Sequence, residues 1–380
     1  IGVYMRYLRP GHIGEASFVG VVMVIAAVVG GAWIQHSSWA PFFTLSRVQL
    51  DIILPLYGFV AAALPVWLLL APRDYLSTYM KIGTIGALAL GIIIVQPQIH
   101  MPAVTSFIGG GGPVVPGPVW PFVCITVACG AISGFHSVIA TGTTPKMLTN
   151  ESEILPIGFG AMLAESFISV MALIAATSLI PADYFAINSV PETFAKLGMN
   201  VQELPMLSQM VGENVAGRPG GAVSLAVGMA HIFSQIPGLG EFMSFLYHFA
   251  IMFEALFILT IIDAGTRVGR YLLQEVGGLI YKPLGDANWT PGVVFTSALI
   301  SFAWGYLIFG GSIASIWPLF GLSNQLLASM ALAIGTTMLL RMGKVKYIWV
   351  TLAPLCFMLV TAVTAGFYNI FEFYLPKGQM

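Results

Sequence analysis

Long apolar runs recur along the whole chain and are its dominant pattern. A helix needs about 20 mostly apolar residues to cross the hydrocarbon core of a bilayer. Nine segments satisfy this requirement and are predicted to span a membrane: 15–35, 51–71, 78–99, 120–141, 157–180, 241–264, 291–310, 316–341 and 347–370. The pattern predicts an all-α, polytopic membrane protein with a single transmembrane domain over residues 1–380.

Two further regions differ from the predicted spans. The apolar stretch 220–237 is interrupted by His231, Gln235 and Pro237. These interruptions favour a half-helix or re-entrant segment and leave a full span as the alternative. Residues 181–219 combine prolines, acidic residues and short amphipathic pieces, and we expect them to form a small extracytoplasmic cap.

Basic residues give the expected orientation, because Lys and Arg collect in cytoplasmic loops. They gather at every second connection between the predicted spans: Arg6, Arg9, Arg73, Lys81, Lys146, Arg267, Arg270, Lys282, Arg341, Lys344 and Lys346. The residue 1 end is therefore expected in the cytoplasm and the residue 380 end outside it. Arg73 and Asp74 are interpreted as a solvated pair in a cytoplasmic turn, with Asp74 capping the next helix. We also expect that further spans precede Ile1.

Composition narrows the class of protein. Hydrophobic residues make up 57% of the chain and charged residues 8%, against about 25% charged residues in a typical soluble domain. The net charge of −1 argues against a nucleic-acid partner, which would favour a basic surface. Cys124, Cys129 and Cys356 form no paired motif, and the sequence contains no HExxH, Walker A or GxGxxG signature. We therefore expect no metal, no cofactor and no enzymatic activity.

Glycine and hydroxyl side chains concentrate near the end of the fourth predicted span. Gly130, Ser133, Gly134 and Ser137 recur at helical spacing. Such a stripe permits close approach of two helices or local unwinding, which frees backbone groups for a ligand or an ion. His136 lies one position off the stripe, and its imidazole can titrate near neutral pH. Two interpretations stay open: a packing face with a hydrogen-bonded histidine, and a substrate or ion pathway.

The predicted span 51–71 contains two prolines, Pro55 and Pro65. Each removes one intrahelical hydrogen bond, so we expect a kinked or discontinuous helix, with simple bends as the alternative. An unwound part near Ala63 to Trp67 would offer backbone groups to a substrate. Pro65 and Trp67 are therefore candidate pathway residues.

Two carboxyl groups lie inside predicted spans, Glu165 in 157–180 and Glu254 in 241–264. Ionisable groups are costly inside a membrane and are functional candidates there. A carboxyl in this environment is either protonated or paired. Both residues are candidate proton carriers, and a structural hydrogen bond between helices is the alternative for Glu165.

Other polar residues in the spans have structural interpretations. Asp263 precedes Arg267 by four residues, which predicts an ion pair on one face of a helix. The neighbouring amides of Asn324 and Gln325 lie in the span 316–341, and we expect them to bridge helices.

Seven stretches together resemble those of a known family. They are YMRYLRPG (4–11), LPVWLLLAPRDYL (64–76), ACGAISGFHSVIATGTTPK (128–146), GAMLAESF (160–167), AVGMAH (226–231), ALFILTIIDAGTRVGR (255–270) and WPLFGLSNQLLA (317–328). In this order, and over nearly its whole length, the chain resembles the carbon starvation protein A family.

The resemblance implies a bacterial inner-membrane transporter of the amino acid–polyamine–organocation superfamily. Its fold would be a partial leucine-transporter-type inverted repeat: core helices 5–10, extra C-terminal spans, and missing N-terminal spans. Span 51–71 would be the discontinuous first helix of the second repeat, and span 120–141 would line the coupling-ion site. The implied substrates are short peptides or small carboxylates such as pyruvate, with protons as the coupling ion and Na⁺ as the alternative.

Two other functions remain as alternatives to transport by alternating access: a passive channel, and a starvation-response membrane protein without transport. The expected partners are the lipid bilayer and the substrate. No oligomeric state follows from the sequence.

Overall fold

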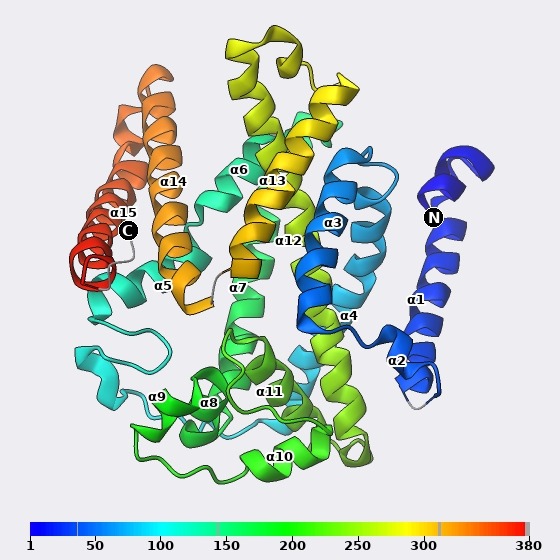
Figure 1. Cartoon of the computed structure of the whole chain (residues 1–380), viewed down its shortest axis with the longest axis vertical. Coiled ribbons are helices and arrows are strands. Elements are labelled where there is room, and N and C mark those ends of the chain that lie inside the picture. The colour runs from blue at the N-terminus through cyan, green and yellow to red at the C-terminus, as the bar shows by residue number, and fades with distance from the viewer. Residues whose placement is uncertain (36, 143, 311–312, 377–380) are drawn as a thin grey trace. The chain divides into compact units, whose positions relative to one another are not determined.

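Regular structure is helical throughout the described part of the chain. The computed structural model describes residues 1–35, 37–142, 144–310 and 313–376. Within these ranges it contains helices and turns but no strand (Figure 1). The all-α prediction is therefore confirmed. Thr143, which belongs to the stretch GTTPK, lies outside the described residues.

Eight helical segments within the described ranges are long and apolar enough to cross a membrane. They are Ile13–Gly31, Leu70–Val95, Val119–Gly142, Glu151–Thr177, Gly240–Ile280, Thr290–Gly310, Leu319–Arg341 and Val345–Glu372. Each overlaps one of the predicted spans. The remaining predicted span, 51–71, overlaps the shorter α3 (Arg47–Ala63). The number of segments that lie in the bilayer stays a prediction.

The helices form two compact units. The first unit comprises residues Ile1–Thr105 and Thr149–Arg267, and the second comprises Ser106–Leu148 and Val268–Met380. The long helix α12 (Met243–Ile280) contributes to both of them.

The core of the first unit is built around α11 (Ala222–Ser234), which packs against α4 (Leu70–Val95) and α7 (Ile154–Thr177). A side chain at Gly228 would meet the Ala175 backbone, with its carbonyl carbon 2.8 Å away, so glycine permits the close approach of α11 to α7. At 13 residues, α11 is shorter than the ~20 residues of a full span. Val227, a core residue of α11, is fully buried.

Residues 181–219 fold into three short helices beside α11: α8 (Pro181–Asn188), α9 (Pro191–Ala195) and α10 (Leu204–Val211) (Figure 1). The buried Asp183 carboxylate accepts the backbone N–H groups of Gln202 and Glu203, both at 2.9 Å. The backbone N–H of Arg218 donates to the carbonyl oxygen of Ile187. These bonds tie the segment into the unit, and its extracytoplasmic location stays a prediction.

The segment after α3 differs from the predicted arrangement. The helix α3 tolerates Pro55 and ends at Ala63, and Leu64 is extended, with φ −72° and ψ 152°. The residue before a proline is pushed out of the helical region, so Pro65 accounts for the break. The next helix, α4, begins at Leu70. The helix ends within the predicted span 51–71, and α4 also contains most of the predicted span 78–99. The predicted turn at Arg73 is wrong, because Arg73 and Asp74 lie inside α4.

In the second unit the predicted span 120–141 is also interrupted. It consists of α5 (Cys124–Ala131) and α6 (Gly134–Gly142), which are separated at Ile132 and Ser133. Both pieces pack against α14 (Ile313–Arg341), and α14 lies along α15 (Trp349–Tyr368) (Figure 1). The remaining long helix is α13 (Thr290–Gly310).

The helix α12 is longer than the sequence pattern predicts. The pattern predicts that this helix ends near residue 264 and that a basic loop follows. Instead, α12 runs unbroken to Ile280. Arg267 and Arg270 are consequently buried helix residues rather than loop residues.

Candidate functional site

The break after α3 leaves backbone carbonyls at the helix end without intrahelical partners. Arg267 of α12 supplies hydrogen-bond donors to two of these carbonyls. Its guanidinium donates to the carbonyl oxygen of Leu64 at 3.0 Å and to that of Ala61. The Leu64 carbonyl, which belongs to the segment predicted to contact substrate, is therefore already bound by Arg267.

Asp263 connects Arg267 with Arg73. The Asp263 side chain is 0% exposed, and its two oxygens lie 3.5 Å from a nitrogen of Arg267 and 3.5 Å from a nitrogen of Arg73. The predicted Asp263–Arg267 pair is confirmed. The interpretation of Arg73 as a solvated residue is wrong, because its side chain is only 17% exposed and donates to the Tyr57 hydroxyl and to the Leu259 carbonyl.

Further polar groups extend this cluster along α4. Arg73 also pairs with Asp74 at 3.1 Å, and the Thr260 hydroxyl lies 3.2 Å from the same Asp74 oxygen. Lys81 donates to that hydroxyl at 3.5 Å, and its ammonium group lies 4.6 Å from the ring centroid of Phe257. We call Arg73, Asp74, Lys81, Asp263 and Arg267 the charge cluster; it contains three cations and two carboxylates.

Trp67, one of the candidate pathway residues, packs against the N-terminal segment of the same unit. The Arg6 guanidinium lies 4.3 Å from the Trp67 ring centroid, and Tyr7 makes an edge contact with the same ring at 5.8 Å. Pro65 is exposed. Two carbonyls at the break are therefore bound by Arg267, and Trp67 makes aromatic and cation contacts with the N-terminal segment.

The second break, between α5 and α6, is held by two amides of α14. The Asn324 side-chain oxygen accepts the Phe135 backbone N–H at 2.9 Å and the Ser133 hydroxyl at 3.2 Å. The buried Gln325 amide, oriented to satisfy both its ends, donates to the Ile132 carbonyl and accepts the Cys129 N–H, both at 2.9 Å. The prediction that these amides bridge helices is confirmed.

The predicted stripe of small residues does not remain on one face, because the break interrupts it. Ser133 and Gly134 are buried against α14, whereas Gly130 and His136 are exposed. Ser137 is half-buried and its hydroxyl donates to the Gly134 carbonyl at 2.6 Å. Of the predicted pathway residues, Ser133 and Gly134 thus contact α14.

The two candidate proton carriers have different surroundings. Glu165 is exposed on α7, in a stretch whose other side chains are also largely exposed. Glu254 is half-buried on α12. Among the described residues, no side chain makes a hydrogen bond or ion pair with the Glu254 carboxyl.

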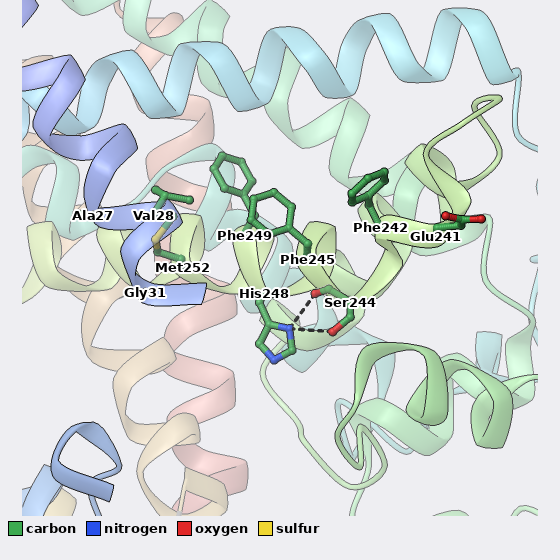
Figure 2. A pocket seen from close by; sticks show the side chains of 10 residues that line it. All are labelled: Ala27, Val28, Gly31, Glu241, Phe242, Ser244, Phe245, His248, Phe249 and Met252. Atoms are coloured by element: carbon green, nitrogen blue, oxygen red, sulfur yellow. Dashed lines mark hydrogen bonds between the residues drawn. The ribbon is translucent and has the colours of Figure 1, made fainter. Parts of the chain in front are cut away.

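A separate pocket of about 430 Å³ lies in the first unit, between α1 (Ile13–Gln35) and the first turns of α12 (Figure 2). Most of its walls are aromatic or small apolar side chains, with no lysine or arginine among the lining residues. His248 lines it, and its Nδ1 donates to the Ser244 carbonyl at 2.7 Å, which leaves Nε2 as an acceptor. The charge cluster does not line this pocket.

Replacing Asn324 by alanine is expected to destabilise the protein by about 1–2 kcal/mol, because the N–H groups that open α6 lose the acceptor that caps them. Chemical unfolding in detergent, followed by intrinsic fluorescence, measures the change. Asn150→Ala is the matched control. Asn150 accepts a backbone N–H from Ser152 at an exposed site, where water can replace the lost bond. Equal losses in the two variants would contradict a special role for Asn324.

Sequence reasoning missed the charge cluster as a functional candidate. The available signal was the scarcity of charge: with 8% charged residues in the chain, three charged positions within LAPRDYLSTYMK of α4 are unusual. They were assigned to the membrane boundary because a basic residue near a predicted helix end is typical of a cytoplasmic turn.

Comparison with known families extends along almost the whole chain. The family described as "Carbon starvation protein CstA" matches residues 1–365. The chain belongs to this family. The eight long apolar helices among its described residues, together with relatives that are named transporters, identify it as a multi-pass membrane protein.

Three relatives of this CstA family chain are informative. It is 54% identical to the peptide transporter CstA of Bacillus subtilis over 99% of its own length and 63% of the relative's. It is 46% identical to the peptide transporter CstA of Escherichia coli, with 98% and 57% covered. It is 42% identical to the pyruvate/proton symporter BtsT of Escherichia coli, with 98% and 58% covered. The chain thus spans about three fifths of the length of these relatives. No solved structure matches it.

Proposed function

We propose that the protein to which this chain belongs is a secondary active transporter that takes up small carboxylates such as pyruvate, or short peptides. The observation that carries the proposal is the pair of helix breaks inside apolar segments, each held by buried polar groups of another helix. Irregular backbone at membrane depth is tolerated where it is enclosed by protein, and in transporters it marks the substrate region. The names of the relatives support the same function.

The superfamily placement is part of the proposal. We infer a leucine-transporter-type inverted repeat of the amino acid–polyamine–organocation superfamily, with this chain holding core helices 5–10 and extra C-terminal spans. The discontinuity between α3 and α4 supports this assignment, since the first helix of each repeat is discontinuous in such folds. The membrane is proposed to be the bacterial inner membrane, with the residue 1 end in the cytoplasm.

The proposed pathway keeps the residues singled out in the sequence: Gly130, Ser133, Gly134, His136, Ser137, Pro65 and Trp67. Ser133 supports this assignment by its place at a helix break. The proposed coupling ion is the proton, with Na⁺ as the alternative. Glu254 is the stronger of the two carrier candidates because it is half-buried and has no partner among the described residues. Glu165 remains the second candidate.

In proteoliposomes containing the intact protein, an inward proton gradient is expected to drive accumulation of radiolabelled pyruvate or dialanine. Glu254→Gln is expected to abolish gradient-driven accumulation and to retain counterflow exchange, since it removes a proton-binding group but not the substrate site. Glu192→Gln, at an exposed carboxyl of α9, is the matched control and should behave like the wild type.

Three outcomes would contradict the proposal or parts of it. Flux without accumulation would indicate a passive channel. Unchanged gradient-driven uptake by Glu254→Gln would exclude Glu254 as the carrier. Unchanged gradient-driven uptake by His136→Ala would remove His136 from the pathway.

A further inference from the structure

We propose that the charge cluster of the first unit binds the carboxylate of the transported substrate through Lys81 and Arg73. This inference deepens the proposed function by naming the residues that recognise the substrate's charge, and it rests on that function for the identity of the ligand.

The charges within the cluster do not balance. Arg73, Lys81 and Arg267 contribute three positive charges, whereas Asp74 and Asp263 contribute two negative ones. The cluster therefore carries a surplus of one positive charge between helices of a membrane protein. An unbalanced charge is costly in such surroundings, and one carboxylate group would neutralise it.

The surplus positive charge is localised on Lys81. Arg267 is bound to two carbonyls and to Asp263, and Arg73 is bound to Asp74 and Asp263. The Lys81 ammonium has no carboxylate within ion-pair distance among the described residues. Its contacts are the Thr260 hydroxyl at 3.5 Å and an aromatic ring. An ammonium group has three donors, so Lys81 retains capacity for an anionic acceptor.

Arg73 and Asp263 are incompletely hydrogen-bonded. The Asp263 oxygens are fully buried, yet they accept no hydrogen bond from a described residue and contact the arginines only at 3.5 Å. The Nε of Arg73 is likewise without a hydrogen-bond acceptor. Arginine binds carboxylates most strongly through two parallel hydrogen bonds, a geometry that Arg73 does not achieve with Asp263. The Arg73–Asp263 contact is therefore not an ideal pair, and the Arg73 Nε retains a donor for a substrate carboxylate.

The polar groups of α4 and α12 form a continuous chain of contacts. Contacts run from Lys81 through Thr260 and Asp74 to Arg73. Asp74 and Arg73 are partly exposed, whereas Asp263 and Arg267 are buried. A carboxylate bound by Lys81 and Arg73 would leave the buried Asp263–Arg267 pair intact. The pocket beside His248 offers no lysine or arginine, which favours the cluster as the anion site.

The test measures binding of pyruvate and of dialanine to the intact protein in nanodiscs by calorimetry. Lys81→Gln removes the surplus charge without breaking an ion pair, and it is expected to raise the dissociation constant about tenfold, the effect of losing one nearby charge in partly screened surroundings. Lys81→Arg should remain near the wild-type affinity. Arg47→Gln is the control for charge alone, because the Arg47 side chain is 82% exposed and lies outside the cluster.

Ligands without a carboxylate complete the test. Methyl pyruvate and dialanine amide are expected to bind the wild type more weakly than the parent compounds, and to be insensitive to Lys81→Gln. A preference for dialanine over pyruvate, or the reverse, identifies the class of carboxylate. The inference is overturned if Lys81→Gln binds pyruvate and dialanine like the wild type, if the ester and amide bind equally well, or if the wild type binds neither acid.

Binding and uptake separate this inference from the proposed function. Wild-type protein that accumulates substrate, with Lys81→Gln and Arg73→Lys both unaffected in uptake and binding, would overturn the carboxylate site and leave transport standing. Lys81-dependent binding without uptake in proteoliposomes would support the site and overturn active transport. Arg73→Lys keeps the charge and removes the Nε donor, so it should raise the KM of uptake and leave kcat near the wild type.

Discussion

Asp263→Ala is expected to lower the free energy of unfolding by about 3–5 kcal/mol, because it leaves two arginines without their shared counter-ion in a buried site. Asp263 is fully buried and lies within ion-pair distance of both Arg73 and Arg267. Loss of this carboxylate would also loosen Arg267, whose guanidinium binds the carbonyls at the end of α3. Thermal or chemical unfolding in detergent measures the change.

The matched control is Asp51→Ala. Asp51 also pairs with an arginine four residues away on a helix, but its partner Arg47 is largely exposed and the distance is 3.9 Å. Exposed pairs of this kind contribute about 0.3–0.5 kcal/mol. A loss of similar size in the two variants would contradict a structural role for Asp263. In the double variant Asp263→Ala/Arg73→Met, removal of one of the two cations that lost Asp263 should recover part of the stability.

Gly134→Ala is the second substitution with a large expected effect, a loss of about 2–3 kcal/mol from overpacking. A Cβ at this position would meet the Asn324 carbonyl oxygen, the Leu327 Cβ at 2.6 Å and the Ala328 backbone nitrogen at 2.7 Å. Two of these atoms are backbone atoms of α14, so no side-chain rotation relieves the contact. The short helix α6 would have to move away from α14, which would also weaken the cap that Asn324 provides.

Gly130→Ala is the control for this substitution. Gly130 belonged to the same predicted stripe, but a Cβ there meets nothing within 4 Å. Alanine has the higher helix propensity, so this variant should be neutral or more stable by up to about 1 kcal/mol. The free energies of unfolding of Gly134→Ala and Gly130→Ala, measured under identical conditions, test this difference. Equal behaviour would show that the close contact at Gly134 does not constrain the packing of α6 on α14.

Local sequence signals predicted features whose cause is local. Pro65 predicted the break after α3, since a proline restricts the residue before it. The amides of Asn324 and Gln325 predicted a bridge between helices, because such groups require partners among apolar surroundings. Asp263 and Arg267 share a helix and lie four residues apart, so their pairing also followed from spacing alone.

Interpretations that depended on a membrane boundary were less successful. Arg73 and Asp74 were assigned to a turn and Arg267 to a loop, because charge at the end of an apolar run is typical of a cytoplasmic connection. The structure places all three inside helices. A charged side chain inside an apolar helix is stabilised when another helix supplies its counter-ion. Sequence spacing within one helix does not reveal such a partner.

By itself the sequence determined that this chain folds as apolar helices, since a segment without water must satisfy its backbone hydrogen bonds internally. It also determined where one helix is interrupted. Only the tertiary structure decided that Arg73 and Asp263 meet, and that Gly134 rather than Gly130 contacts α14. These contacts depend on how distant helices cross and on the register of their faces, and residues far apart in the chain carry no periodic signal for either.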